Sequence, residues 1–245
     1  MAYFDVVRAT SGLLAYWPLG ETSGTSAFDY KGGYTGTYTG SPTLNSTKMK
    51  PGFDMGCPTF VKASSQYVAM GDVSALEANA NLSIECWFTL SALPTVGEVL
   101  DALYGKLNHY YVTYYNNAGT YMFHTSANHT DTPAQNTVTL TVNQVYHFVL
   151  TWNGTTVKHY LDGVQLGSDR TQTSAAPAST ATAVEIGRFN GTYYHSGKIA
   201  HVAHYNTALS AATVLQHYNQ GVSEMAYSNN YQFMSGSGSF SERIK

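Results

Sequence analysis

The chain has 245 residues, enough for one large β domain or two small ones. Hydrophobic residues make up 43% of it, which excludes a disordered chain, and no apolar run is long enough to form a transmembrane helix. Charged residues make up only 11%, and the 15 acidic and 12 basic side chains are scattered singly. Nucleic-acid binding, which needs a basic surface, is therefore not expected, and neither is membrane insertion.

The first ten residues do not resemble an export signal. Asp5 and Arg8 lie where such a signal has a basic start and a long apolar stretch. Cys57 and Cys86 are too few for a disulfide framework or a four-thiolate zinc site. Cys86 lies in an alternating strand pattern, which favours a buried free thiol, but the sequence leaves a disulfide between the two open.

Strand patterns with a period of two follow one another along most of the chain. In Leu82–Leu90, for example, Ile84, Cys86 and Phe88 alternate with Glu85 and Trp87. The predicted strands are Leu13–Leu19, Tyr67–Met70, Leu82–Leu90, Tyr110–Tyr115, Thr120–Thr125, Thr137–Val142, Val145–Trp152, Thr156–Leu161, Val184–Arg188 and Gly197–Tyr205.

Two Gly-containing turns predict an antiparallel meander. Asn153-Gly154 and Asp162-Gly163 are both typical of tight type I′ hairpins. One short helix is predicted over Ala211–Gln220, with Ser210 as its N-cap and Gly221 at its C-terminal end. Many short strands broken by Gly and Asn indicate an all-β fold, a sandwich or barrel, rather than a parallel α/β sheet.

The sequence divides into one domain with two arms. Residues 1–11 are expected to form an N-terminal arm and residues 12–222 the β domain. The tail 223–245 changes in composition, and its Ser/Gly run at 235–239 is typical of a flexible spacer. The tail is predicted to be either a frayed terminus or an arm that docks on a neighbouring subunit.

Several segments, in order, resemble the laminin-G-like jelly rolls of the concanavalin A-like superfamily. The resemblance extends over about Gly12–Gly221. It rests on the opening Gly12–Glu21, on the Glu-x-Trp strand Leu82–Phe88, on the hairpin Tyr146–Gly163, and on the closing strands with the helix after Leu209. It implies a sandwich of two antiparallel sheets, a jelly roll whose first and last strands are adjacent, of a kind used mostly to bind glycans or other proteins.

The resemblance also implies a calcium site. Glu21 and Asp29 follow the first strand, where members of the family often hold calcium through loop oxygens. The chain departs from the family at Ala200-His201, where relatives have an acidic residue. The alternative role for Asp29 is a turn-stabilising side chain that accepts backbone hydrogen bonds.

Catalytic signatures are missing. Glycosidases need two carboxyl groups on one surface, and Glu85 has no carboxylate at the same-face positions of its strand, Ser83 and Trp87. His201 and His204, three apart on a strand, face opposite sides and are not expected to share a metal. We therefore expect no enzymatic activity.

Two aromatic and amide-rich clusters are candidates for sugar contacts. One contains Asn108 and Tyr110. The other lies between two closing strands and contains Arg188, Asn190, Tyr193, Tyr194 and His195. Aromatic faces flanked by amides and hydroxyls suit sugar rings, although the high Tyr content makes a structural role the alternative for each cluster. Trp17, Trp87 and Trp152 are expected in the core.

The function predicted from the sequence is recognition and display. The Tyr, Thr, Ser, Asn and Gly bias resembles that of phage structural proteins that carry jelly rolls on capsids or tails. Such a role would place the chain on a virion surface, with an extracellular location as the alternative. The expected partners are a glycan or cell-surface ligand, other proteins of a particle, and identical chains that contact it through the terminal arms. The alternative functions are a purely structural subunit and a glycoside hydrolase.

Overall fold

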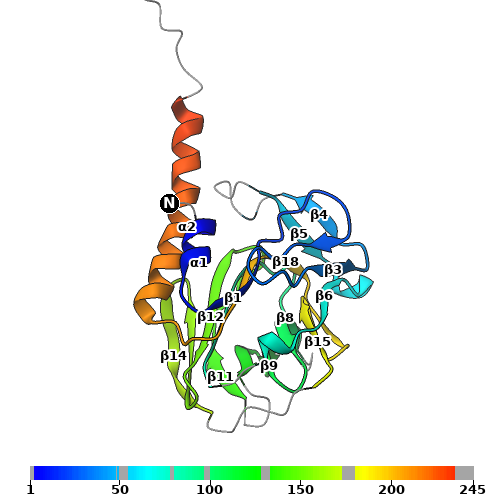
Figure 1. The fold of residues 1–245 in the computed structure, drawn as a ribbon, viewed down its shortest axis with the longest axis vertical. Coiled ribbons are helices and arrows are strands. Elements are labelled where there is room, and N and C mark those ends of the chain that lie inside the picture. Colours follow the sequence, from blue (N-terminus) through cyan, green and yellow to red (C-terminus); the bar gives the residue numbers. More distant parts are fainter. Residues whose placement is uncertain are drawn as a thin grey trace, which may run out of the picture.

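The computed structural model describes residues 3–47, 49, 55–77, 80–96, 100–127, 133–172 and 180–234, with side chains described as far as Ser223. Two antiparallel sheets face one another as a jelly-roll sandwich, as the sequence predicts, and two helices lie on the outer side of the first sheet (Figure 1). The Ser/Gly run at 235–239 lies outside the described residues.

The first sheet has eight strands, seven of them in one continuous order. Its order is β14 (Val164–Thr171), β13 (Thr156–Leu161), β12 (Tyr146–Trp152), β7 (Leu82–Phe88), β18 (Gly197–Tyr205), β5 (Cys57–Phe60) and β4 (Thr43–Ser46). The first strand, β1 (Leu13–Trp17), pairs with the last strand, β18, which confirms the adjacency expected of a jelly roll.

The second sheet also has eight strands. Its order is β11 (Ala134–Thr137), β10 (Thr120–Ser126), β9 (Tyr110–Asn117), β8 (Asp101–Lys106), β15 (Ala183–Ile186), β6 (Tyr67–Asp72), β3 (Gly36–Thr39) and β2 (Ser26–Ala27). The remaining described elements are a small hairpin of β16 (Arg188–Phe189) with β17 (Tyr193–Tyr194) and two 3₁₀ turns, η1 (Lys62–Ser64) and η2 (Ser74–Leu76).

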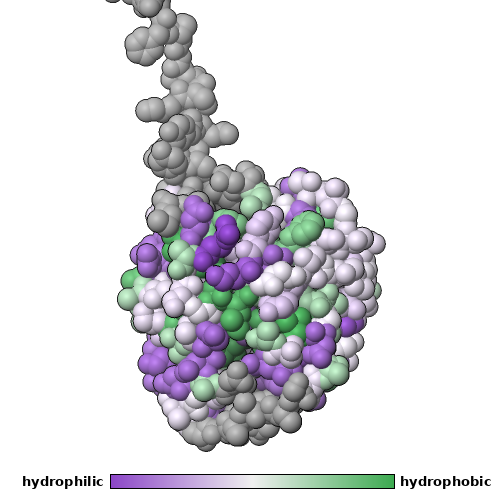
Figure 2. Space-filling view, in the orientation of Figure 1, coloured by the Kyte–Doolittle hydropathy of each residue, from purple (hydrophilic) through white to green (hydrophobic). Residues whose placement is uncertain are grey.

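The main core lies between the sheets. Alternate residues of β7 and β12 point into it, among them Phe88, Phe148 and Trp152. Trp17, Trp87 and Trp152 are all buried, as predicted, although Trp87 faces the helices rather than the second sheet. Figure 2 shows hydrophobic residues gathered over the middle of one face, between the two sheets, with hydrophilic residues around them.

Helices α1 (Tyr3–Ala9) and α2 (Ala211–Met234) cover the outer face of the first sheet (Figure 1). Tyr3, Val7 and Val214 form a second core with Trp87 and Tyr205 of the sheet. The expectation of an N-terminal arm over 1–11 is therefore wrong for residues 3–9, because apolar side chains of α1 are buried in this core.

Helix α2 is longer than predicted. Ser210 caps its start as expected, since its hydroxyl accepts a hydrogen bond from the Thr213 N–H at 3.1 Å. Gly221, expected at the C-terminal end, lies inside the helix instead, where a side chain would overlap the Trp87 indole. The helix continues to Met234 and extends beyond the body of the domain (Figure 1). None of the described helices is long and apolar enough to cross a membrane.

The two hairpin turns differ from one another. Asp162 and Gly163 both have positive φ, 51° and 81°, which confirms the type I′ turn between Leu161 and Val164. Gly154 has a φ of 91°, but Asn153 does not adopt positive φ, and its side chain accepts the amide N–H groups of Thr155 and Thr156. The prediction of a type I′ turn at Asn153-Gly154 is therefore wrong, because this side chain supplies the turn's hydrogen bonds.

Other strand boundaries also differ from the predictions. Strand β1 ends at Trp17, before Pro18, and Leu19 has a φ of 60°. The strand predicted over Thr137–Val142 occupies Ala134–Thr137, and Val138 and Leu140 reach the core from an irregular segment. Strand β18 has a bulge between Ala200 and Ala203, with His201 at a φ of 52°.

Cys57 and Cys86 are both buried free thiols, so the disulfide left open by the sequence does not form. His201 contacts the Tyr16 hydroxyl on the outer face of the first sheet, whereas His204 contacts Tyr104 between the sheets. Their opposite directions confirm the sequence prediction, and the described residues contain no group of three or more side chains suited to a metal.

Burial lowers the pKa of four histidines, to about 3 for His159 and His204 and to about 4 for His195 and His201. The ordinary pKa is about 6.5, so below pH 6.5 the unfolded chain binds more protons than the folded one. Stability should therefore fall as the pH decreases from about 6.5 to 3, by about 1–2 kcal/mol per histidine at pH 5. Urea unfolding midpoints between pH 8 and pH 5 measure this loss, and a midpoint that stays constant from pH 7 to pH 5 would contradict it.

Candidate functional site

Glu85 is buried between the first sheet and the two helices and is not part of a surface groove. Its carboxylate accepts hydrogen bonds from Tyr3 Oη at 2.7 Å and Tyr205 Oη at 2.8 Å. His147 Nε2 lies 2.8 Å from Oε1, and His217 Nδ1 lies 2.9 Å from Oε2. One side chain thus joins β7, β12, β18, α1 and α2.

The hydrogen bonds around His217 assign its protons. The Thr10 hydroxyl donates to the Val6 carbonyl, so its oxygen accepts from His217 Nε2 at 2.9 Å. His217 Nδ1 faces a carboxylate, which only accepts. Both ring nitrogens therefore carry protons, and His217 is an imidazolium paired with ionised Glu85. Burial alone would lower the pKa of His217, but the charge of Glu85 outweighs burial and raises it.

The same pairing sets the state of Glu85. Burial raises the pKa of a carboxyl group, yet His217 and His147 hold the pKa of Glu85 well below its ordinary value. A glycosidase acid must be protonated and must reach the substrate. Glu85 is ionised, is 0% exposed and is surrounded by hydroxyl and imidazole donors, so it fits a structural role.

The structure places the cluster at residues 188–195 in the β16–β17 hairpin, where most of its groups contact one another. The Arg188 guanidinium lies 3.5 Å from the centroid of the Tyr67 ring and pairs with Glu185. Tyr193 stacks on buried Phe189 with ring centroids 6.4 Å apart. Tyr193 and Tyr194 are half-buried, and Asn190 is exposed at the turn.

Two of the predicted ligand contacts lie inside the protein. His195 is 0% exposed, and its Nδ1 lies 3.1 Å from the Tyr114 hydroxyl. Tyr110 is also fully buried and stacks on Tyr104 between the sheets. Both side chains point into the core, Tyr110 from β9 and His195 from the short connection between β17 and β18. Asn108 is exposed at the β8–β9 turn, apart from the core position of Tyr110.

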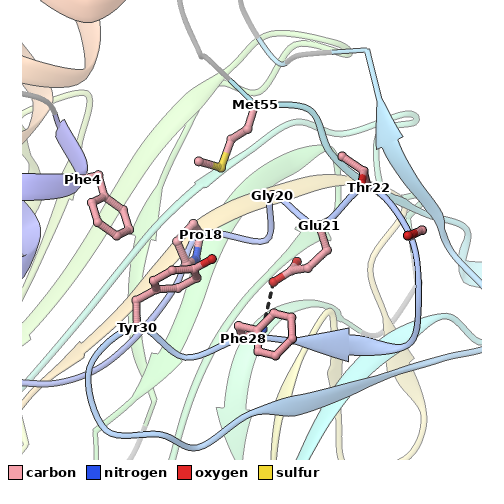
Figure 3. A pocket seen from close by; sticks show the side chains of 9 residues that line it. Phe4, Pro18, Gly20, Glu21, Thr22, Phe28, Tyr30 and Met55 are labelled. Atoms are coloured by element: carbon pink, nitrogen blue, oxygen red, sulfur yellow. Dashed lines mark hydrogen bonds between the residues drawn. The ribbon is translucent and has the colours of Figure 1, made fainter.

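A pocket of about 480 Å³ opens between α1 and the loop that follows β1. This volume lies in the range of small-molecule sites, roughly 300–1,000 Å³. Figure 3 shows Phe4 on one side and Glu21 and Phe28 on the other, with Pro18 and Tyr30 between them. Its remaining lining residues are Gly20, Thr22, Ser23 and Met55.

The aromatic side chains of the pocket are unusually accessible. Phe28 is 51% exposed and Tyr30 is 49% exposed. Phe4 contacts Tyr30 edge-to-face, with ring centroids 5.4 Å apart. Large exposed aromatic rings beside a carboxylate and hydroxyl groups form a surface with both apolar faces and hydrogen-bonding edges.

Asp29 explains why Phe28 and Tyr30 point outward. Its two carboxylate oxygens accept the N–H groups of Tyr16, Lys31, Gly32 and Tyr34, at 2.8–3.0 Å. The carboxylate therefore lies inside the loop, and the residues on either side of it face the pocket. Glu21 fixes the other end of the loop, accepting the Phe28 N–H and the Tyr38 hydroxyl, both at 2.8 Å.

These hydrogen bonds also decide how well the loop fits calcium. An ionised carboxylate has about four acceptor positions, and four N–H groups occupy those of Asp29. Calcium needs carboxylate oxygens as part of its six to eight ligands, and both oxygens of Glu21 also already accept hydrogen bonds, from the Phe28 N–H and the Tyr38 hydroxyl. The pair Glu21 and Asp29 therefore does not fit a calcium site, and Asp29 fits the alternative role of stabilising the turn.

Calcium is expected to leave the stability of the protein unchanged. Saturation by an ion at 100 times its Kd would add about 2.7 kcal/mol to the free energy of unfolding, a shift in Tm of several degrees. Thermal melts in millimolar calcium and in excess chelator should instead coincide. A Tm higher in calcium, and lost on Asp29→Asn, would show that the loop binds the ion.

Sequence reasoning recognised Glu21 but missed the pocket around it. Phe28 and Tyr30 flank Asp29 in a Gly- and Ser-rich loop, and this aromatic-Asp-aromatic pattern is the one local signal that could have indicated them. Phe4 and Met55 come from distant parts of the sequence, so only the folded chain brings them to the site.

The sequence profile of the concanavalin A-like lectin/glucanases superfamily matches residues 62–215, more than half of the chain. The chain belongs to this superfamily. A search of curated proteins finds no match.

Three solved structures show the same fold. Domain 4 of AbnA, a GH43 extracellular arabinanase from Geobacillus stearothermophilus solved in complex with arabinotriose, matches over 84% of this chain and 98% of its own, with a TM-score of 0.54 and 15% identity. The binding domain of Paraclostridial Mosquitocidal Protein 1 matches over 85% of this chain and 52% of its own, with a TM-score of 0.63 and 10% identity.

Trypanosoma rangeli sialidase matches over 86% of this chain, with a TM-score of 0.61 and 14% identity. The matched region is 33% of the sialidase, so this chain spans about a third of that enzyme.

Proposed function

We propose that the chain is a non-catalytic glycan-binding module and that the pocket beside α1 holds the sugar. The observation that carries this proposal is the pair of exposed rings, Phe28 and Tyr30, in a pocket of about 480 Å³ that also contains a carboxylate. Ring faces pack on the apolar faces of pyranose or furanose units, while Glu21, Thr22 and Ser23 offer partners for sugar hydroxyls.

The relatives support a sugar as the ligand. The arabinanase domain is a single domain that this chain matches over nearly the whole of the domain's length, and it was solved with an oligosaccharide. Glu21 is the sole ionisable acid among the lining residues of the pocket, which favours neutral sugars over acidic ones because a carboxylate repels a second anion.

A hydrolase is the alternative, since a sialidase and an arabinanase are among the proteins with similar structures. Two observations favour binding over hydrolysis. Glu85 is buried and ionised, and the lining residues of the pocket include one carboxylate where a glycosidase needs two.

Replacing Phe28 or Tyr30 by Ala should weaken sugar binding roughly 5- to 30-fold, because each loses a ring face worth about 1–2 kcal/mol. Titration calorimetry with neutral oligosaccharides, including arabinotriose, measures the effect, and sialyllactose tests the expected preference against acidic sugars. Tyr193→Ala and Tyr194→Ala are the matched controls and should leave binding unchanged. Loss of binding in these two variants would move the site to the β16–β17 hairpin, and release of sugar products would restore the hydrolase.

We also propose that the module is displayed on a particle such as a virion, with α2 as its attachment. The support is that α2 extends beyond the domain (Figure 1) and shows Leu215 and Val222 at its surface, 44% and 38% exposed. Replacing Leu215 and Val222 by Ser together with removal of residues 223–245 should then reduce the native mass of the assembly while the melting curve of the domain is retained. An unchanged mass in light scattering would overturn this attachment.

A further inference from the structure

The pocket has one wall that is held in place by the buried charge cluster. We propose that Tyr3 and Thr10 are positioning residues, which hold α1 on the sheet through Glu85 and His217 and so place Phe4 against the ligand. This inference rests on the proposed function, because it concerns the residues that determine sugar affinity at the same pocket.

Helix α1 is too short to be stable by itself. It has seven residues, about two turns, whereas isolated helices in water need roughly 12–15 residues to be even marginally stable. Its position therefore depends on tertiary contacts, and the contacts at its two ends decide where its outer side chains lie.

Both ends of α1 are joined to the same buried ion pair. At the start of the helix, the Tyr3 hydroxyl donates to Glu85 at 2.7 Å. Just after its end, the Thr10 oxygen accepts from His217 Nε2 at 2.9 Å, and His217 in turn pairs with Glu85. The Tyr3 ring also packs edge-on against Trp87 and His201, with centroids 5.8 and 5.1 Å apart.

Phe4, the next residue, lies on the side of α1 that faces the pocket. Its ring lies 5.5 Å from that of Tyr16 and 5.4 Å from that of Tyr30, and it lines the pocket opposite Phe28 (Figure 3). Any shift of α1 that breaks the Tyr3 hydrogen bond also moves Phe4, because the two residues are adjacent on one helix.

The backbone of the loop that carries Phe28 and Tyr30 is held without α1, although the Tyr30 ring also touches Phe4. Phe28 and Tyr30 stand on the loop that Asp29 and Glu21 hold by hydrogen bonds to β1, to Tyr38 and within the loop itself. Loosening α1 should therefore remove one wall and leave the other, so that affinity falls without being abolished.

A pair of matched substitutions tests the proposal. Tyr3→Phe and Tyr205→Phe each remove one phenol donor from Glu85, at 2.7 and 2.8 Å, but Tyr205 belongs to β18 and not to α1. We expect Tyr3→Phe to speed hydrogen exchange in residues 3–10 roughly tenfold or more, and Tyr205→Phe to leave that segment protected at a similar loss in Tm.

A second readout reports on the pocket without a sugar. Thr22 is exposed at the pocket and the native thiols are buried, so Thr22→Cys takes an acrylodan label selectively. Its emission should shift to longer wavelength with Tyr3→Phe and also with Phe4→Ala, which removes the wall while α1 stays protected from exchange. Tyr205→Phe should leave the emission unchanged.

Affinity for arabinotriose completes the test. Tyr3→Phe and Phe4→Ala should weaken it, and Tyr205→Phe should not. Equal effects of Tyr3→Phe and Tyr205→Phe on exchange and emission, or no effect of Tyr3→Phe, would overturn the coupling. If arabinotriose fails to bind the unsubstituted protein, that result counts against the proposed function, while the two sugar-free readouts still decide the coupling.

Discussion

A carboxylate that has no contact with water must be compensated by the protein itself, and Glu85 imposes this requirement on the centre of the first sheet and the helices that cover it. Two phenols and two imidazoles surround it, one of them charged. They come from four elements that are distant in sequence, so the charge is stable only when β12, β18, α1 and α2 are all in place around β7. Removing one partner leaves a buried charge partly unmatched, which makes the arrangement cooperative.

This arrangement explains why the central strands of the first sheet, β7, β12 and β18, are buried on both faces. One face packs on the second sheet, and the other is closed by helices that need a specific polar contact to fix their position. The border of this helical layer coincides with the edge of the loop after β1, where the pocket opens. The elements that close the outer face of the sandwich and the elements that shape the pocket are therefore partly the same.

Period-two patterns predicted most of the long strands, but not β8 or β14. The sequence around Ser210 predicted the start of α2, because a helix cap depends on neighbouring residues. The same alternation places Glu85 and Trp87 together on the other face of their strand. It does not predict that helices pack on that face, because no neighbouring residue of the strand indicates them. Tyr110 lies in the core and not at the surface for a related reason. Alternation shows that two residues share a face, but the direction of that face depends on the partner sheet. The pocket escaped prediction because its walls come from segments far apart in the chain.

The bulge in β18 has a consequence for the rest of that strand. Ile199 points between the sheets, and strict alternation would send Tyr205, six residues later, in the same direction. The extra residue near His201 reverses the parity, so Tyr205 points outward to Glu85 while Val202 and His204 fill the interior. If the strand kept all its residues but paired regularly through His201, the remainder of the strand would be inverted, with Tyr205 pointing between the sheets and His204 toward the helices. The left-handed backbone of His201 thus determines which side chains of the last strand face the helices and which face the second sheet.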